Sequence, residues 1–208
     1  MTRRLRRIAG LCGLLSAGFF VAADLTGAAL RPGYSVIAQA ISELIERGAP
    51  NKPLLDALLL GFHGLVIPFA LGLGRAVRPG PGGPLAPLLL ALAGGLGVIL
   101  TLFFPCDPGC QPMTPRGTAH IFIAVPMGVS VVLSIAAFGW RFSTDPEWRS
   151  LAGYSYATSA AGLVLAFVTV ALAESDVVGL IERILTASYL QWYVVVGLTL
   201  MRGRGVRA

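Results

Sequence analysis

Asp24 and His63 are ionisable residues that lie inside long apolar stretches of this chain. A charged group at the centre of a membrane helix costs about 2.5–3.5 kcal/mol on insertion scales. Such residues therefore face a partner, a cavity or water. A carboxylate beside a histidine fixes the tautomer of the ring and raises its basicity, as general-base and metal sites require. We predict that Asp24 and His63 face each other as an acid–base pair; the alternative is a buried polar pair that only specifies helix packing.

Asp107 and His120 extend this candidate site, because they lie near the same ends of the apolar stretches as Asp24 and His63. Placement on one side predicts a polar pocket that opens on that side of the membrane. The predicted catalytic residues are Asp24, His63, Asp107 and His120. The predicted substrate-binding residues are Ser42, Glu43, Tyr189, Gln191 and Trp192, and Tyr193 lies in the same stretch as the last three.

The histidine content restricts the possible cofactors, since the chain has two histidines in all. A zinc site needs about four ligands, and no ligand pattern supplies them. A single haem held by His63 and His120 is disfavoured by the unequal depths of the two residues. We predict no metal site and no cofactor.

Cys106 and Cys110 flank the turn Asp107-Pro108-Gly109. Proline presets φ and glycine tolerates positive φ, so the turn brings the two cysteines together. We predict a structural disulfide. A redox-active pair is the alternative, although the spacing is not Cys-x-x-Cys. Cys12, the third cysteine, lies in an apolar stretch and is predicted to pack there.

The elements that must position these residues are membrane helices. Of 208 residues, 55% are hydrophobic and 12% are charged, whereas soluble domains carry about 25% charged residues. Six stretches approach the roughly 20 apolar residues that a membrane helix needs. We predict an all-α integral membrane protein with a single six-span domain and spans at residues 8–30, 54–73, 85–104, 119–139, 151–173 and 181–200.

Residues 34–47 form a polar stretch between the first two spans. Their apolar residues recur at helical spacing, with polar residues on the other side. The stretch is too short to cross a membrane, so we predict an amphipathic extracytoplasmic helix that lies along the interface or covers the bundle. The alternative is a plain interfacial elbow.

Basic residues are unevenly divided between the two sides of this layout, and the positive-inside rule then places both termini in the cytoplasm. The net charge of +6 thus reflects topology and predicts no nucleic-acid partner. Membrane lipids are the expected partners. The basic residues on the side of the termini are Arg3, Arg4, Arg6, Arg7, Arg75, Arg78, Arg141, Arg149, Arg202, Arg204 and Arg207; those on the other side are Arg31, Arg47, Lys52, Arg116 and Arg183.

Further motifs follow one another along the chain: Arg31-Pro32-Gly33-Tyr34-Ser35, Ile41-Ser42-Glu43-Leu44, Gly48-Ala49-Pro50-Asn51, Phe104-Pro105-Cys106-Asp107-Pro108-Gly109-Cys110 and His120. Together they resemble a bacterial membrane-protein family catalogued as domain of unknown function 998. The resemblance covers essentially the whole chain; it implies a small multispanning protein and assigns no catalytic residues. The expected location is the bacterial inner membrane.

Three functions are compatible with the sequence. The first is the binding or processing of a lipid or isoprenoid-like molecule in the outward-opening pocket, and whether this includes catalysis is left open. The second is a non-catalytic structural or regulatory role in the membrane. The third is small proton-coupled transport, which would need a polar route to the inner face; the inner halves of the predicted spans carry no charged residues.

Overall fold

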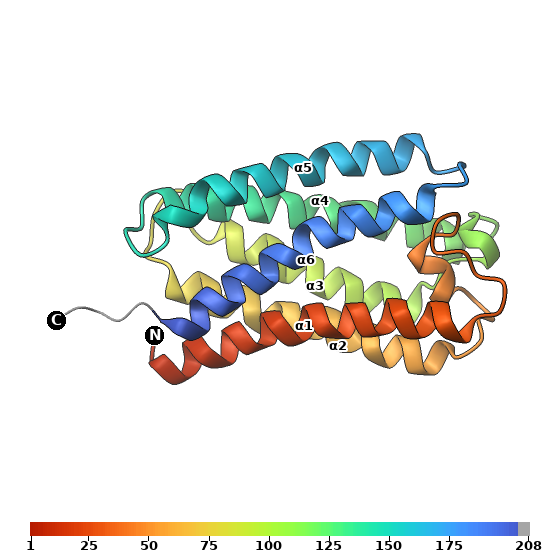
Figure 1. Cartoon of the computed structure of the whole chain (residues 1–208), viewed down its shortest axis with the longest axis horizontal. Coiled ribbons are helices and arrows are strands. Elements are labelled where there is room, and N and C mark those ends of the chain that lie inside the picture. The colour runs from red at the N-terminus through yellow and green to blue at the C-terminus, as the bar shows by residue number, and fades with distance from the viewer. Residues whose placement is uncertain (204–208) are drawn as a thin grey trace.

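The structure is a computed structural model that describes residues 1–203. It is all-helical in this range, and six helices are long and apolar enough to cross a membrane (Figure 1). The predicted fold class is therefore confirmed, and the chain is a multi-pass membrane protein. Arg204 and Arg207, two of the basic residues assigned to the side of the termini, lie outside the described range. The helices are α1 Arg3–Leu30, α2 Lys52–Ala76, α3 Leu85–Phe103, α4 Pro115–Ser143, α5 Ala152–Ala171 and α6 Val178–Arg202.

Most helices extend beyond the apolar stretches that mark them in the sequence, because their first and last turns are polar. The hydroxyl of Thr2 accepts a hydrogen bond from the Leu5 amide at the start of α1. Thr114 caps α4 in the same way, and Pro115 occupies the first helical position. Capping hydroxyls and an initial proline are favoured at helix starts. Hydropathy alone does not register these polar turns.

The six helices form a closed ring, since each packs against its neighbours in sequence and α6 returns to α1. Gly10 and Gly197 lie opposite each other where α1 packs against α6. A Cβ added to Gly10 would lie 2.5 Å from the carbonyl oxygen of Gly197. Small residues permit such close approach of membrane helices.

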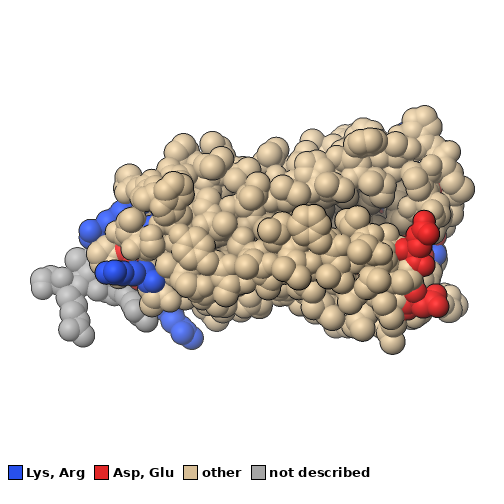
Figure 2. Space-filling view, turned by 90° about the horizontal axis from the view of Figure 1, so that it is seen from above, with Lys and Arg blue, Asp and Glu red and all other residues tan. Residues whose placement is uncertain are grey.

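The ring has two ends with different loops (Figure 1). We call the end with the N-terminus of α1 and the C-terminus of α6 the terminal end. The opposite end, with residues 31–51 (the α1–α2 loop) and residues 104–114 (the α3–α4 loop), is the loop end. In Figure 2, basic residues gather at the terminal end and acidic residues at the loop end, with an uncharged surface between them. Such a band fits the apolar interior of a bilayer.

Aromatic side chains fill the ring towards the terminal end. Trp192 lies between Phe69 and Phe138, with ring centroids 6.3 and 5.7 Å away. Phe142 stacks on Trp148 at 5.0 Å. All five side chains are fully buried, so this half of the bundle has a closely packed core.

Arg141 fastens the loop between α2 and α3 at the terminal end. Its guanidinium donates hydrogen bonds to the carbonyl oxygens of Gly74 and Val77, both at 2.7 Å, and of Arg78 at 3.1 Å. Asp145 accepts the Arg78 amide at 2.8 Å. These contacts close the terminal end of the ring with intramolecular bonds.

Packing is looser towards the loop end, where α4 and α5 have little buried surface. None of residues 121–129 of α4 or 163–171 of α5 is buried. Large apolar side chains such as Phe122 and Phe167 are 75% and 70% exposed there. In a membrane these side chains contact lipid.

The α1–α2 loop is less helical than the predicted helix over residues 34–47. Its helical part is a single 3-10 turn, Ile41–Ile45, whose apolar side chains are buried against the bundle. In an α-helix the backbone amides and carbonyls of these residues would hydrogen-bond to one another. Here several of them hydrogen-bond to side chains instead. The hydroxyl of Tyr34 donates to the carbonyls of Gln39 and Ala40, and Glu43 accepts the Ala40 amide.

Candidate functional site

A cavity of about 30 Å³ lies inside the ring where α2, α3, α4 and α6 meet. This volume holds roughly one or two water molecules. The cavity is near the middle of the bundle, because Gly94 and Gly128 lie close to the middle of α3 and α4. Its lining residues are Phe62, His63, Val66, Ala93, Gly94, Met127, Gly128, Val131, Tyr189 and Tyr193.

His63 is the predicted catalytic residue that lines this cavity. Its side chain projects from α2 towards α3 and is 9% exposed. A Cβ added to Gly97 would lie 2.0 Å from its Nδ1, so the missing side chain of Gly97 makes room for the ring. Phe62 lies beside the ring, with centroids 4.4 Å apart. The imidazole makes no hydrogen bond to any residue in the range 1–203.

Tyr193 and Tyr189 line the cavity from α6, one helical turn apart. Tyr193 is 1% exposed and packs on Phe69, with ring centroids 5.6 Å apart. Its hydroxyl has no hydrogen-bond partner within the described part of the chain. The hydroxyl of Tyr189 donates to Thr186 Oγ1 at 3.3 Å. The His63 ring and the Tyr193 hydroxyl thus border the cavity without a hydrogen-bond partner among residues 1–203.

Asp24 does not pair with His63 as predicted. Its Oδ1 and Oδ2 accept hydrogen bonds from Arg183 Nη2 at 2.7 Å and Nε at 3.1 Å. The reason is the rotation of the helices: Asp24 faces α6, whereas His63 faces α3. Asp24 instead lines a separate cavity of about 10 Å³ beneath the α1–α2 loop. The structure therefore does not bring these two predicted catalytic residues together.

Arg183 is not among the predicted site residues, but the structure places it in a network of hydrogen bonds. Besides Asp24, it donates to the hydroxyl of Tyr34 at 2.9 Å and to the carbonyl of Val36 at 2.8 Å. Glu182 turns away from it, and its Oε2 accepts the amide of Ile41 at 2.7 Å. Adjacent helical residues point to different sides of a helix, so Glu182 and Arg183 bind different segments of the chain.

Tyr34, on the α1–α2 loop, belongs to the same hydrogen-bond network as Arg183. Burial raises the pKa of Tyr34 to about 12, although the hydrogen bond from Arg183 opposes the rise. The phenol is therefore neutral at physiological pH and acts as a hydrogen-bond donor to Gln39 and Ala40.

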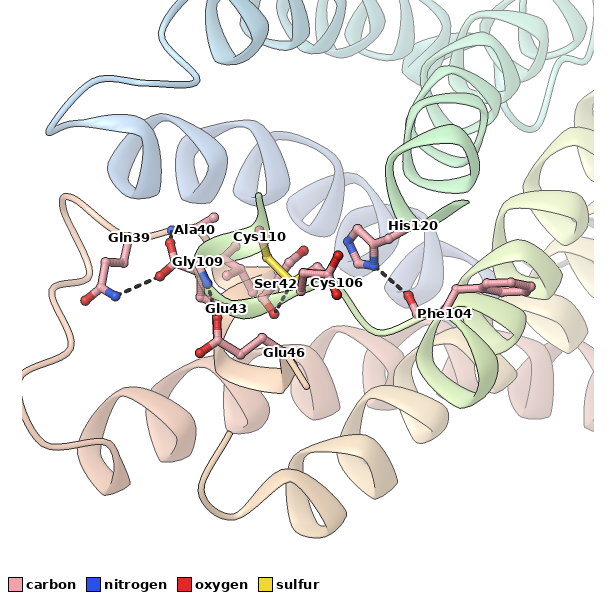
Figure 3. Close-up of a disulfide and its surroundings, with 12 residues drawn as sticks. Gln39, Ala40, Ser42, Glu43, Glu46, Phe104, Cys106, Gly109, Cys110 and His120 are labelled. Carbon is pink, nitrogen blue, oxygen red and sulfur yellow. Dashed lines mark hydrogen bonds between the residues drawn. A yellow bond between two sulfur atoms is a disulfide. The ribbon is translucent and has the colours of Figure 1, made fainter. Parts of the chain in front are cut away.

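Ser42 and Glu43 belong to the 3-10 turn of the α1–α2 loop (Figure 3). Glu43 is buried, and its two carboxylate oxygens accept the Ala40 amide at 2.9 Å and the Gln39 side chain at 2.7 Å. The carbonyl oxygen of Ser42 lies 3.4 Å from the Sγ of Cys106. Their predicted part in substrate binding stays a prediction.

Cys106 and Cys110 are joined, with their sulfur atoms 2.03 Å apart, in agreement with the predicted disulfide. Residues 106–110, which we call the disulfide loop, contact the α1–α2 loop directly. Glu46 accepts the Gly109 amide at 2.6 Å, and the Arg47 amide donates to the carbonyl of Cys106 at 2.9 Å. The disulfide loop therefore holds the α1–α2 loop against the bundle.

Asp107 lies within the disulfide loop and is 1% exposed. It accepts hydrogen bonds from the Thr114 amide at 2.7 Å and the Met113 amide at 3.0 Å, and it pairs with Arg47 at 2.9 Å. Burial by itself would raise the pKa of Asp107, but the hydrogen bonds from Thr114 and the charge of Arg47 outweigh it and lower the pKa. Asp107 is thus an ionised residue that organises the start of α4.

His120 lies in the first turns of α4 and is 2% exposed. Its Nδ1 is 2.7 Å from the carbonyl oxygen of Phe104 (Figure 3). A carbonyl only accepts, so Nδ1 carries the hydrogen and Nε2 is left as an acceptor. His120 does not line the cavity beside His63.

Gln191 and Trp192 join α6 to α5 and do not line the cavity. Gln191 accepts from Tyr154 and donates to Thr158 Oγ1 at 3.3 Å. Trp192 donates from Nε1 to Ser155 Oγ at 2.9 Å. Among the predicted substrate-binding residues, Tyr189 alone lies at the cavity.

Residues 1–203 contain no cluster of three or more His, Cys, Asp or Glu side chains arranged to hold a metal ion. A family model described as a protein of unknown function (DUF998) matches residues 14–199. Neither a curated protein nor a solved structure matches the chain.

Proposed function

The chain belongs to the DUF998 family, whose function is unknown, and we propose that it binds a lipid or isoprenoid-like molecule in the cavity beside His63. The observation that carries this proposal is the pair of unpartnered polar groups on His63 and Tyr193. More than about 90% of buried polar groups in proteins have a hydrogen-bond partner. A polar group of a ligand in the cavity would supply the partner that both side chains lack.

The route into the cavity favours a ligand that arrives from the membrane. Gly128 lines the cavity and is also exposed on the surface of α4. The neighbouring exposed side chains Phe122, Val125 and Val129 are apolar. An apolar chain can therefore lie along α4 in the bilayer while its polar end enters the cavity.

Binding is a better supported function than catalysis or transport. Of the four predicted catalytic residues, only His63 lines the cavity, while Asp24 and Asp107 are occupied by Arg183, Thr114 and Arg47. The aromatic core around Trp192 occupies the ring between the cavity and the terminal end, which argues against a polar transport route.

A structural role is the second candidate, and the loop end favours it. Arg183, Asp107 and the Cys106–Cys110 disulfide all act in holding the α1–α2 loop to the helices. A protein whose polar residues only organise packing would show these contacts. In such a protein, water in the cavity of about 30 Å³ would pair with His63 and Tyr193.

We also propose that both termini lie in the cytoplasm and that the membrane is the bacterial inner membrane. The excess of basic residues on the side of the termini supports this orientation.

The test of the proposed function places a bulky side chain at the exposed edge of the cavity. Gly128 lines the cavity and a Cβ added to it meets nothing within 4 Å, so Gly128→Leu obstructs the approach along α4 without disturbing the backbone. Gly95→Leu is the matched control: its Cβ also meets nothing within 4 Å, and Gly95 lies on α3 outside the cavity lining.

The measurement is mass spectrometry of the intact purified protein, which counts retained lipid-like molecules. We expect the wild-type protein and Gly95→Leu to retain one such molecule, and Gly128→Leu to lose it. Equal retention by all three proteins would show that any bound lipid lies elsewhere and would contradict the proposal.

A further inference from the structure

We infer that the polar end of the ligand is an uncharged hydroxyl or carbonyl group on a long apolar chain. This inference rests on the proposed function and names the class of molecule that the same cavity accepts. It follows from the charges, the hydrogen-bonding groups and the size of the cavity.

The cavity offers no charged partner to a ligand. Among residues 1–203, no Asp, Glu, Lys or Arg lines the cavity, and the polar side chains in its lining are those of His63, Tyr189 and Tyr193. A phosphate or carboxylate would be buried there without a counter-charge, and burying an unpaired charge is strongly unfavourable. The charges at the loop end are already paired, as in Asp24 with Arg183 and Asp107 with Arg47. The lining therefore selects against anionic headgroups.

The hydrogen-bonding groups of the cavity suit a neutral ligand. A tyrosine hydroxyl both donates and accepts, and a neutral imidazole has one donor and one acceptor nitrogen. The Tyr193 hydroxyl and the His63 ring are both free for this purpose within residues 1–203. A ligand hydroxyl can donate to one and accept from the other, and a ligand carbonyl can accept from either.

The size of the cavity points to the same class. Its volume of about 30 Å³ fits a group about as large as one or two water molecules. A hydroxyl or carbonyl is of that size, whereas a phosphate has four oxygens around its phosphorus. The apolar remainder of the ligand would lie outside, past Gly128, against the exposed apolar side chains of α4.

The test is a series of ligands with one chain and different ends: hexadecanol, hexadecane, palmitate and hexadecyl phosphate. Their affinities are measured by displacement of radiolabelled hexadecanol from the full-length protein in detergent at neutral pH. We expect hexadecanol to bind about tenfold or more tightly than the other three, because only its end is both neutral and hydrogen-bonding.

Tyr193→Phe then tests the contact itself. We expect it to weaken hexadecanol binding roughly three- to tenfold, the usual effect of one lost hydrogen bond, and to leave hexadecane binding unchanged. Tyr156→Phe is the matched control, since Tyr156 is exposed on α5 and does not line the cavity.

The outcomes separate this inference from the proposed function. If hexadecyl phosphate or palmitate binds as tightly as hexadecanol, or if hexadecane does, the neutral-end inference is wrong. The proposed function still stands in those cases, provided that Gly128→Leu abolishes the binding. If no member of the series binds, or if Gly128→Leu leaves all binding unchanged, both the inference and the proposed function are wrong.

Discussion

Arg183 joins three segments of the chain through one guanidinium group. It binds Asp24 on α1, Tyr34 and Val36 on the α1–α2 loop, and the carbonyl of Gly179 on its own helix. The side chains of Arg183 and Asp24 are 15% and 16% exposed. At this burial, removing one partner leaves the other charge without compensation.

We predict that Arg183→Met lowers the free energy of unfolding by about 3 kcal/mol. The double variant Asp24→Asn/Arg183→Met should recover part of this loss, because no unpaired carboxylate remains. Thermal denaturation in detergent measures both. Arg75→Met, which removes an exposed arginine that donates to the carbonyl of Leu71, is the control. An equal effect of the two single variants would contradict the prediction.

Asp107 predicts a pH dependence of stability. Its pKa is lowered in the folded protein, so folding favours the ionised carboxylate. The resulting stabilisation is present above the ordinary aspartate pKa of about 3.9 and is lost as the pH falls through the lower folded pKa.

We therefore expect Asp107→Asn to be less stable than the wild type at neutral pH, with a difference that shrinks as the pH falls below about 4. Chemical denaturation across this pH range measures it. Asp56→Asn provides the comparison, because Asp56 pairs with Lys52 on the surface of one helix. A difference between wild type and Asp107→Asn that stays constant with pH would be incompatible with this role.

At the scale of the helices, the ring depends on places where the missing side chain of a glycine leaves room for a neighbouring helix. The contact of α1 with α6 at Gly10 is one, and the notch at Gly97 that holds the His63 ring is another. Glycine is required at both because any Cβ would overlap a neighbouring atom. The second contact also sets the position of the cavity.

We predict that Gly10→Leu lowers the free energy of unfolding by about 1–3 kcal/mol, the usual effect of overpacking. Gly18→Leu on the same helix should have little effect, because a Cβ there meets nothing within 4 Å. Thermal unfolding of both variants in one detergent decides this. If Gly18→Leu is the more damaging substitution, the described contact between α1 and α6 is wrong.

The disulfide loop is the element that fastens the α1–α2 loop, and its chemistry is testable directly. Counting free thiols in the denatured, unreduced protein should find Cys12 alone, since Cys106 and Cys110 are joined. Three reactive thiols would rule out the disulfide.

On the scale of the whole molecule, the two halves of the bundle differ in packing. The terminal half has the aromatic core, and the loop half has the exposed apolar faces of α4 and α5. The cavity beside His63 lies between them. A site at this boundary is enclosed on one side by the aromatic core, and on the other side it borders Gly128, which is exposed on α4.

The proposed orientation gives a prediction for the whole molecule. A cysteine placed at Ser143, at the terminal end of α4, should resist membrane-impermeant thiol reagents in intact cells. A cysteine at Asn51, in the α1–α2 loop, should react. Both are introduced into a Cys12→Ser background, and the reverse labelling pattern would invert the proposed topology.

The sequence by itself determined the class of protein, the six membrane helices and the disulfide. Each of these follows from properties that are local in the chain: the hydropathy of about 20 residues, or a turn between two cysteines four residues apart.

Only the tertiary structure decided which polar residues meet. Asp24 and His63 lie on consecutive helices at similar depths, yet they face different neighbours. The partner of Asp24 is 159 residues away in sequence, and the cavity beside His63 draws on four helices. The physical reason is helix rotation: a turn of one residue, about 100°, moves a side chain from one neighbour to the next. Hydropathy sets the depth of a residue in the membrane, but close packing against the other helices sets the direction in which its side chain points.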